Sequence, residues 1–279
     1  LLMSGFALLL LDGCPEVLAI GIQGFSFRSI GDPQNESMQH GSREGFVEPL
    51  QINMTMLRRR MKTTKLKFEQ FTAGKESGTM LCLCYLRDRV SPELLRAVRR
   101  QLKEAQLDAV LAAGYVSPFL RGKGSLSLFS TVGLSERPDT VCGKIEEGRV
   151  AILIDGTPNV IVLPHLFLEN FQSLDDYANR PFYAAFTRVL KLLAFFLAMY
   201  LPGFYVAAST FHPERIPEPL LLKIAQSELN TPFSVMVEAI VIHIIYEIMR
   251  EAGLRAPKSL GHAVSIVGAL VIGDSAVNS

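Results

Sequence analysis

The pattern of apolar and polar positions divides the chain near residue 190. Before it, short apolar runs alternate with polar segments, and residues 192–210 then form a stretch of 19 residues without a formal charge. At about 1.5 Å per residue, a helix of this length reaches about 28 Å, close to the roughly 30 Å hydrocarbon core of a bilayer. Pro202 and Gly203 are tolerated in a membrane helix whose neighbours satisfy the freed carbonyl groups. The stretch predicts a membrane span, and a buried core helix of a large globular domain is the alternative.

Two apolar segments earlier in the chain each predict a β-hairpin. Residues 5–11 form an apolar run that leads into an Asp-Gly pair, and a second run follows at residues 17–20. Asp-Gly adopts the backbone angles of a tight hairpin turn. The pattern returns 143 residues later, at residues 148–163, where six of 16 aligned positions are identical. We predict two related hairpins in two subdomains, and turn chemistry explains Asp12 and Asp155 better than a pair of catalytic carboxylates does.

Periodic segments between the hairpins predict a mixed region of helices and strands. A helix is predicted to start near Pro49 and to end in a basic cluster, because apolar residues recur about one turn apart at Phe46, Leu50, Met54, Leu57 and Met61. Strands are predicted at residues 66–71 and 80–86. Ser91-Pro92 precedes a second amphipathic helix, and Pro138 begins a short third one. The fold class that follows is α+β or α/β.

The composition agrees with a soluble region joined to a membrane region. The chain is 49% hydrophobic and 20% charged, and its 28 Lys and Arg against 27 Asp and Glu exclude the basic excess of nucleic-acid binding. We predict soluble subdomains at residues 1–76 and 77–180 and the start of a helical membrane domain at 181–279. The chain begins Leu-Leu-Met and stops inside an apolar pattern, so we interpret it as a fragment. Its four cysteines contain no C-x-x-C and predict reduced, cytosolic core packing.

The motifs of enzymes and cofactor sites are not found in the sequence. It contains no serine nucleophile elbow, metal-ligand set or dinucleotide fingerprint. Residues 122–125 read G-K-G-S, but the glycine that a phosphate loop needs five residues earlier is replaced by Ser117. We therefore predict no catalytic residue, no cofactor and no metal, and a membrane-tethered enzyme is the least favoured class.

A second apolar segment, at residues 232–249, carries Glu238, His243 and Glu247. Each charge at the centre of a spanning helix costs about 2.5 to 3.5 kcal/mol on insertion scales, so these groups should not face lipid. At 100° per residue, His243 and Glu247 share one helix face. We predict that the three residues belong to an ion path or a polar contact between helices. A helix that lies partly in the membrane interface, with its charges in water, is the alternative.

A third apolar segment, at residues 261–277, is rich in small residues. A stripe of them lets a neighbouring backbone come close, which predicts a pore-lining or oligomer-forming helix, or tight packing inside one subunit. The candidates for this packing or pore role are Gly261, Ser265, Gly268 and Gly273. A slight excess of cations before residue 192 and after residue 249 predicts that the soluble region faces the cytoplasm.

Seven motifs carry a resemblance to one protein family. They are GSREGFVE (41–48), LRRRMK (57–62), ERPD (136–139), EGRVAILIDGTP (147–158), DDY (175–177), FHPE (211–214) and IVGALVIG (266–273). In this order the chain resembles the A subunits of GerA-type spore germinant receptors over nearly its whole length. It departs from the family pattern at Pro49 and in the loop at residues 117–134. Charged residues in the motifs are candidates for subunit contacts: Arg43, Glu44, Arg58, Arg59, Arg60, Glu136, Arg137 and Asp139.

The resemblance implies an architecture and a function beyond what the residues alone indicate. It implies a cytoplasmic region of two subdomains followed by several membrane helices, in the inner membrane of the dormant spore. It also implies partners: a B-type transporter-like membrane subunit, a C-type lipoprotein, the lipid bilayer and further copies of the chain. Such a complex responds to nutrients, and its A subunits resemble oligomeric ion-conducting components. A non-conducting scaffold subunit is the alternative to this function.

Overall fold

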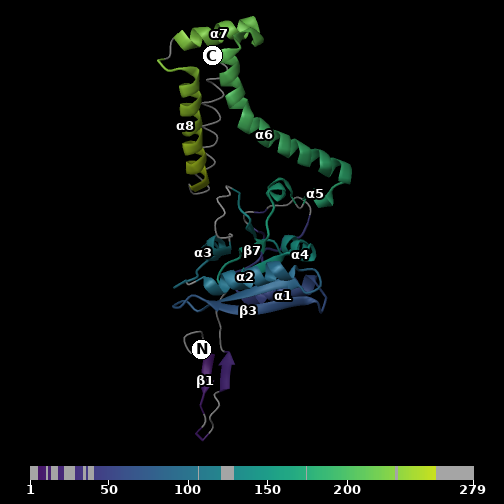
Figure 1. Ribbon diagram of the computed structural model, residues 1–279. Helices are drawn as coiled ribbons and strands as arrows, with labels where there is room; N and C mark the ends of the chain where they lie inside the picture. The colour runs from purple at the N-terminus through teal and green to yellow at the C-terminus, as the bar shows by residue number, and fades with distance from the viewer. Residues whose placement is uncertain are drawn as a thin grey trace. The chain divides into compact units, whose positions relative to one another are not determined.

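The computed structural model describes residues 6–10, 12–13, 18–21, 29–33, 36, 41–105, 107–120, 129–173, 175–229 and 232–255 (Figure 1). The chain divides into two compact units, Leu1–Ala185 and Phe186–Ser279. The first unit contains the strands and short helices, and the second contains long helices. The predicted helix-packing candidates Gly261, Ser265, Gly268 and Gly273 lie outside the described residues.

A five-stranded antiparallel sheet forms the centre of the first unit. Its strands are β3 (Leu66–Ala73), β4 (Thr79–Leu86), β5 (Gly133–Ser135), β6 (Val150–Ile154) and β7 (Val160–Leu163), in the order β3-β4-β6-β7-β5. β6 and β7 confirm the second predicted hairpin, and Gly156 in its turn has φ 85°. Residues with side chains, Asn and Asp apart, rarely adopt this left-handed region, which explains the glycine.

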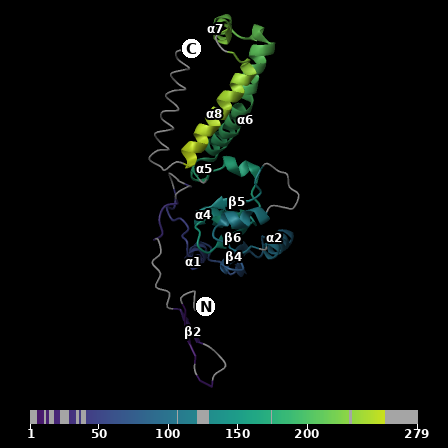
Figure 2. The same ribbon diagram turned by 90° about the vertical axis from the view of Figure 1, so that its left-hand side faces the viewer.

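Helices cover both faces of this sheet, so the fold has three layers (Figure 2). α1 (Leu50–Arg60) and α4 (Pro138–Glu146) pack on one face, and α2 (Pro92–Glu104), α3 (Ala113–Val116) and the 3-10 helix η2 (Ser117–Leu120) pack on the other. β4 shows how one strand serves two cores. Cys82 and Cys84 lie in the core under α1 and α4, whereas Leu81 and Leu83 lie in the opposite one, because side chains alternate along a strand. A mixed α/β region is therefore confirmed.

The helix boundaries follow the proline signals in the sequence. α1 begins at the residue after Pro49, and Pro92 and Pro138 occupy the first turns of α2 and α4. Proline is tolerated there because the first amides of a helix have no partner within it. After β7 the chain forms the 3-10 helix η3 (Phe167–Phe171), and α5 (Asp175–Ala178) follows it.

The first predicted hairpin is also confirmed. β1 (Phe6–Leu9) and β2 (Leu18–Gly21) pair antiparallel and form a two-stranded sheet of their own, and Gly13 between them has φ 82°. The predicted subdomain boundary at residues 76/77 falls between β3 and β4, which pair along their whole length. The division at this point into subdomains 1–76 and 77–180 stays a prediction.

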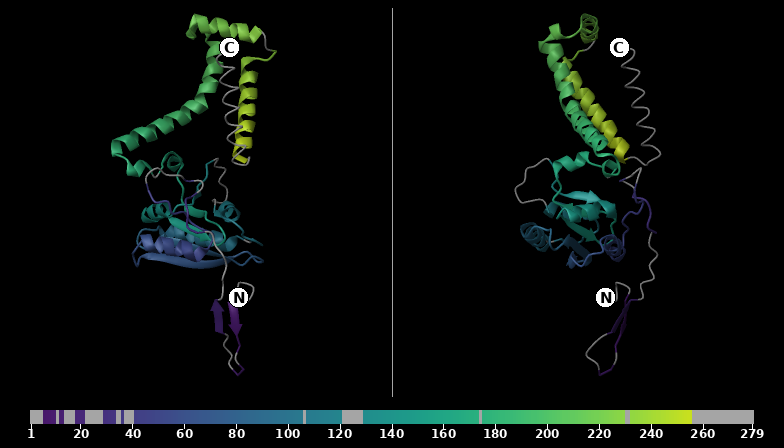
Figure 3. Two further views of the ribbon diagram at one scale, coloured as in Figure 1. Left: turned by 180° about the vertical axis from the view of Figure 1, so that it is seen from behind. Right: turned by 90° about the vertical axis from the view of Figure 1, so that its right-hand side faces the viewer.

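The second unit consists of helices that follow one another along the chain (Figure 3). α6 (Pro181–Phe211) starts in the first unit and continues into the second. The 3-10 helix η4 (Pro213–Arg215) and α7 (Glu218–Leu229) connect it to α8 (Val235–Arg255). Among the described residues, α6 is the one helix long and apolar enough to cross a membrane, and none of its most apolar window is buried. This differs from a core helix of a soluble domain, which would be mostly covered.

Candidate functional site

The polar residues singled out in the sequence meet where the segment before α1 contacts the start of α4. We call this group the Arg137 network: Glu36, Ser42, Glu44, Arg59, Arg60, Ser135, Arg137 and Asp139. Apart from Glu36, its members come from the GSREGFVE segment, the last turn of α1, β5 and the start of α4 with its N-cap. Three motifs far apart in the sequence are thus neighbours in space.

Arg137 is the centre of the network, with only 3% of its surface exposed. Its guanidinium donates to both carboxylate oxygens of Asp139, at 3.1 and 2.6 Å. It also donates to the main-chain carbonyl of Ser42 at 2.8 Å and to that of Glu36 at 3.2 Å. A buried cation is tolerated when it is paired and its other donors find acceptors, which is the case here. Arg137 therefore holds the main chain of Glu36 and Ser42 beside the start of α4.

Glu44 makes the second centre, at the end of α1. Arg59 Nη2 donates to both of its carboxylate oxygens at 2.6 Å, and Arg60 Nη2 donates to Oε2 at 2.8 Å. The hydrogen bond from Arg59 is the main cause of the lowered pKa of Glu44, and Arg60 adds to it. Arg60 also donates to the Ser42 hydroxyl at 2.7 Å. The basic end of α1 thus binds a carboxylate of the same chain.

The pKa of Glu36 is shifted in the opposite direction from that of Glu44. Desolvation raises the pKa of its carboxyl, although the Ser135 hydroxyl donates a hydrogen bond to Oε2 at 2.9 Å and opposes the rise. Nearby, the main-chain amide of Phe46 donates to the carbonyl of Glu136 at 2.8 Å. Glu136 therefore joins the same region through its backbone.

Two of the candidates for subunit contacts, Arg43 and Arg58, lie outside the Arg137 network. Arg43 is exposed. Arg58 stacks over the ring of Phe68, 4.8 Å from its centroid, and donates weakly to the carbonyls of Thr63 and Leu66, both at 3.4 Å. That any of the eight residues contacts another subunit stays a prediction.

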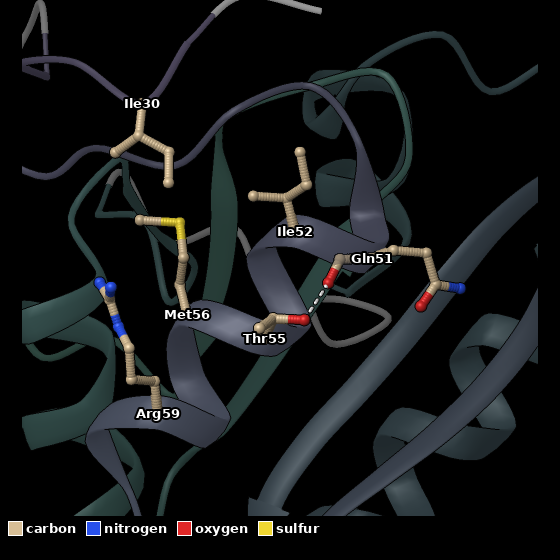
Figure 4. A pocket seen from close by; sticks show the side chains of 6 residues that line it. All are labelled: Ile30, Gln51, Ile52, Thr55, Met56 and Arg59. Carbon is tan, nitrogen blue, oxygen red and sulfur yellow. Dashed lines mark hydrogen bonds between the residues drawn. The ribbon is translucent and has the colours of Figure 1, made fainter. Parts of the chain in front are cut away.

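A shallow hollow opens on the outer side of α1 (Figure 4). It is lined by Ile30, Gln51, Ile52, Thr55, Met56 and Arg59. The Thr55 hydroxyl donates to the main-chain carbonyl of Gln51 at 2.8 Å, so this polar group is already satisfied within the helix. The hollow is mostly apolar, and Arg59 at its edge is held by Glu44. Among the described residues, no group of three or more His, Cys, Asp or Glu could hold a metal ion.

Sequence reasoning missed a second charged group, around Glu169 of η3. Glu169 forms ion pairs with Arg149 and, at 3.4 Å, with Lys144, and its Oε2 lies 3.1 Å from His165 Nδ1. Burial alone would raise the pKa of Glu169, but its interactions with Arg149 and Lys144 outweigh burial and lower that pKa. Lys144 and Arg149 lie 25 and 20 positions before Glu169, so local spacing gave no signal for these two ion pairs, although His165 and Glu169 are four residues apart.

The three ionisable candidates of the second unit all lie on α8. Oε1 of Glu238 is buried and has no hydrogen-bond partner among the described residues. Arg250 Nε donates to Oε2 of Glu247 at 2.9 Å, one helical turn further on. The described residues do not bring the three side chains together through a hydrogen bond or an ion pair, and their role in an ion path stays a prediction.

Comparison with known proteins shows the family of the chain. The family model described as Bacillus/Clostridium GerA spore germination protein matches residues 1–279. The chain belongs to the GerA family of spore germination proteins. This is a family of receptors rather than of enzymes, and its A subunits act in receptor complexes.

Several GerA relatives match the whole chain. It is 41% identical over 278 residues to spore germination protein KA of Bacillus subtilis (strain 168), covering 100% of this chain and 51% of the relative. It is 38% identical to the uncharacterized membrane protein YfkQ of the same organism, covering 54% of it. The chain thus spans about half the length of the curated relatives it matches. Among solved structures, the chain matches the crystal structure of the N-terminal domain of the A subunit of the Bacillus megaterium spore germinant receptor GerK3. The two sequences are 35% identical and the TM-score is 0.36, and the match covers 44% of this chain and 97% of that chain.

Proposed function

We propose that this chain is part of an A subunit of a nutrient-responsive spore germinant receptor, and that the subunit couples germinant sensing to ion release. The observation that carries the proposal is the match of the GerA family model along all 279 residues. The arrangement of a mixed α/β unit before a long, exposed apolar helix supports it, because a receptor subunit of a membrane complex needs both a water-soluble part and a membrane part.

The proposed location is the inner membrane of the spore, with several spans and the α/β unit in the cytoplasm. α6 is the first span, and its 31 residues exceed the about 20 that cross a bilayer. The name of the relative YfkQ describes it as a membrane protein, which agrees with this location. The cations Arg188 and Lys191 early in α6 support a cytoplasmic start of the helix under the positive-inside rule.

The proposed partners are a B-type transporter-like subunit, a C-type lipoprotein and further copies of the A subunit. Arg43 and Arg58 are the candidates for such contacts that stay exposed and are not held by a carboxylate of the chain among the described hydrogen bonds. The other candidates already bind within the Arg137 network or through the main chain. A partner would have to break these bonds to use them.

The proposed ion-conducting role rests on α8. A buried carboxylate oxygen without a partner is costly in an apolar surrounding, so a protein keeps it where a cation or a polar partner can reach it. Among the described residues, Oε1 of Glu238 is such a group. The test replaces Glu238, His243 and Glu247 one at a time by Gln in the full-length protein. Spores are then assayed for nutrient-triggered release of monovalent cations, with Glu214→Gln, an exposed carboxylate of η4, as the control.

Slower cation release in the α8 variants, with normal release in the control, is the expected result. Unchanged release in all three variants would reject their role in conduction. A non-conducting scaffold is the second candidate, and the Glu247–Arg250 pair favours it, because that carboxylate is already neutralised on its own helix. Reconstitution of the full-length subunit alone in liposomes separates the two candidates, since only a conducting subunit carries a current.

A further inference from the structure

The first turns of α6 expose their apolar side chains and cover their small and polar ones. Phe182 is 87% exposed and Phe186 is 58% exposed. The buried Ala184 and the half-buried Thr187 and Arg188 lie on the covered side. A helix at the surface of a soluble domain shows the reverse, with its apolar stripe covered and its charges in water. The exposed side of this segment is therefore suited to a surrounding other than water.

The exposed apolar side chains form one continuous face. At 100° per residue, they fall within about 120° of the helix circumference, the width of an apolar stripe that faces a partner. We call this surface the α6 apolar face: Phe182, Tyr183, Phe186, Val189 and Leu190. By the same spacing, Arg188 and Lys191 lie on the other side of the helix. The segment is therefore amphipathic, with its apolar side outward.

The charges around the α6 apolar face have one sign. Arg180, Arg188 and Lys191 are cations, and the sequence contains no Asp or Glu from residue 177 to residue 213. Anionic phospholipid headgroups carry the complementary charge and attract basic residues beside a membrane. A helix with Lys or Arg on its polar side and aromatic residues on its apolar side is typical of segments that lie in a membrane interface.

The position of this face along α6 indicates the same surrounding. Residues 181–191 precede the uncharged stretch, which begins at residue 192 of the same helix. At about 1.5 Å per residue they extend about 16 Å, whereas the headgroup region on one side of the bilayer core is about 5 to 8 Å thick. An upright helix would therefore carry Phe182 through the headgroups into water. α6 bends along its length (Figure 1), so its first turns need not stand upright.

We propose that residues 181–191 form an interfacial segment that lies along the cytoplasmic surface of the membrane crossed by α6. The α6 apolar face enters the boundary between headgroups and acyl chains. Arg180, Arg188 and Lys191 bind anionic phospholipid headgroups, which their long side chains reach from the polar side of the helix. This inference rests on the membrane location of α6 in the proposed function and is independent of the proposed ion conduction.

The test measures membrane depth in the full-length protein, reconstituted in liposomes of phosphatidylcholine and phosphatidylglycerol. The native cysteines are replaced by alanine, and a nitroxide is attached to single cysteines at Phe182, Phe186 and Lys191. Leu197, within the uncharged stretch, is the lipid control, and Leu111, which is 63% exposed in the α/β unit, is the water control. Each label is read by its relaxation with oxygen, which concentrates among acyl chains, and with a nickel chelate, which stays in water.

The expected result is a lipid contact at both phenylalanine positions. Phe182→Cys and Phe186→Cys should show oxygen-to-nickel ratios about tenfold above that of Leu111→Cys, because an interfacial apolar face is buried by about 5 to 10 Å. Lys191→Cys should show a lower ratio than Phe186→Cys, although it lies nearer to the span. An upright helix would give the opposite order, with a ratio that rises from residue 182 to residue 191, and would overturn the proposal. If Phe186→Cys lowers the yield of folded protein, Val189→Cys reads the same face.

The controls separate a failure of this proposal from a failure of the proposed function. A lipid-like Leu197→Cys with a water-like Phe182→Cys overturns the interfacial segment and leaves the membrane span intact. A water-like Leu197→Cys overturns the membrane location of α6 and the interfacial segment with it. Shielding of Phe182→Cys from both reagents would mean that another protein subunit, rather than lipid, covers the face.

The role of charge is tested by Arg180→Gln, Arg188→Gln and Lys191→Gln in the chain labelled at residue 182. In liposomes with phosphatidylglycerol, each substitution should lower the ratio of lipid-bound to water-exposed label about fivefold, which corresponds to about 1 kcal/mol per basic residue. In pure phosphatidylcholine the effect should be small. Lys75→Gln, which replaces an exposed cation of the α/β unit, is the matched control. Equal effects of the substitutions in both lipids would overturn the assignment to anionic headgroups.

Discussion

Asp155 caps a helix that begins 105 residues before it in the sequence. Its carboxylate oxygen Oδ1 lies 2.9 Å from the main-chain nitrogen of Leu50, at the start of α1. Pro49 precedes this residue and offers neither a side-chain acceptor nor an amide hydrogen. The amide of Gly156 in turn donates to the carbonyl of Glu48 at 2.9 Å. The β6–β7 turn and the start of α1 are therefore joined by two reciprocal hydrogen bonds.

The first prediction concerns this cap. Asp155→Ala should lower the free energy of unfolding by about 1 kcal/mol, the typical cost of losing a helix N-cap. Asp155→Asn should retain most of the stability, because the amide oxygen can still accept the bond. Denaturant titration of the full-length protein measures both, with Asp108→Ala, a highly exposed carboxylate, as the control. Equal stability of Asp155→Ala and the wild type would contradict a capping role.

The second prediction concerns the centre of the Arg137 network. Arg137→Ala should lower the free energy of unfolding by about 3 kcal/mol, because it leaves the Asp139 carboxylate and two main-chain acceptors without their donor. Arg137→Lys should recover only part of this loss, since an ammonium cannot reproduce the two parallel bonds to Asp139.

Exposed Arg43 provides the matched control for this position. Arg43→Ala should change stability by less than about 0.5 kcal/mol, as is usual for surface substitutions. The same denaturant titration measures all three variants. If Arg137→Ala proved as mild as Arg43→Ala, Arg137 would not hold Glu36 and Ser42 in place.

The third prediction is a pH dependence that arises from Glu169. Its pKa is lowered in the folded protein, so the folded state binds fewer protons than the unfolded state in the acidic range. The charge of Glu169 therefore stabilises the protein at pH values above the ordinary carboxyl pKa. This stabilisation is lost as the pH falls through the folded-state pKa of Glu169. At pH 7, Glu169→Gln should lower the free energy of unfolding by about 2 kcal/mol, which is within the range for hydrogen bonds to charged groups. At pH values below the folded-state pKa of Glu169, the substitution should have little effect.

Thermal unfolding across pH 3 to 7 checks the Glu169 prediction. Glu147→Gln is the control, because Glu147 contacts the same cations, Lys144 and Arg149, from a more exposed position. Its effect should be below about 1 kcal/mol at every pH. A Glu169→Gln difference that stayed constant from pH 7 to pH 3 would show that shape, rather than charge, is what Glu169 contributes.

The fourth prediction tests α6 as a membrane span. Leu197 lies next to the midpoint of this 31-residue helix and within its uncharged stretch. Leu197→Arg should raise the apparent free energy of insertion by about 2.5 to 3.5 kcal/mol, and Leu197→Ala much less. Insertion is measured by glycosylation mapping of α6 in a reporter protein. Efficient insertion of the Arg variant would argue against contact of this position with lipid.

The sequence was sufficient for features that depend on neighbouring residues. The Asp-Gly pairs predicted both hairpins, because a tight turn needs these residue types wherever it occurs. The prolines at positions 49, 92 and 138 predicted where helices begin, since proline cannot donate an amide within a helix. The long uncharged stretch predicted α6, and the segments at residues 66–71 and 80–86 predicted the strands β3 and β4.

Features that join distant residues were not predictable in this way. The sequence pointed to GSREGFVE, LRRRMK and ERPD as separate motifs, but it did not show that Glu44 binds Arg59 and Arg60 or that Arg137 holds the carbonyl of Ser42. It also did not reveal the ion pairs of Glu169 with Lys144 and Arg149, whose spacing follows no helical or strand period.

The sequence by itself determined the two hairpins, the starts of α1, α2 and α4 and the long apolar helix α6, because local backbone preferences and apolar periodicity reside in a few consecutive residues. Only the tertiary structure decided the strand order β3-β4-β6-β7-β5 and the carboxylate that caps α1. The reason is physical: charged and polar groups far apart along the chain meet only after two apolar cores have packed on the faces of one sheet, and that packing depends on all the segments at once.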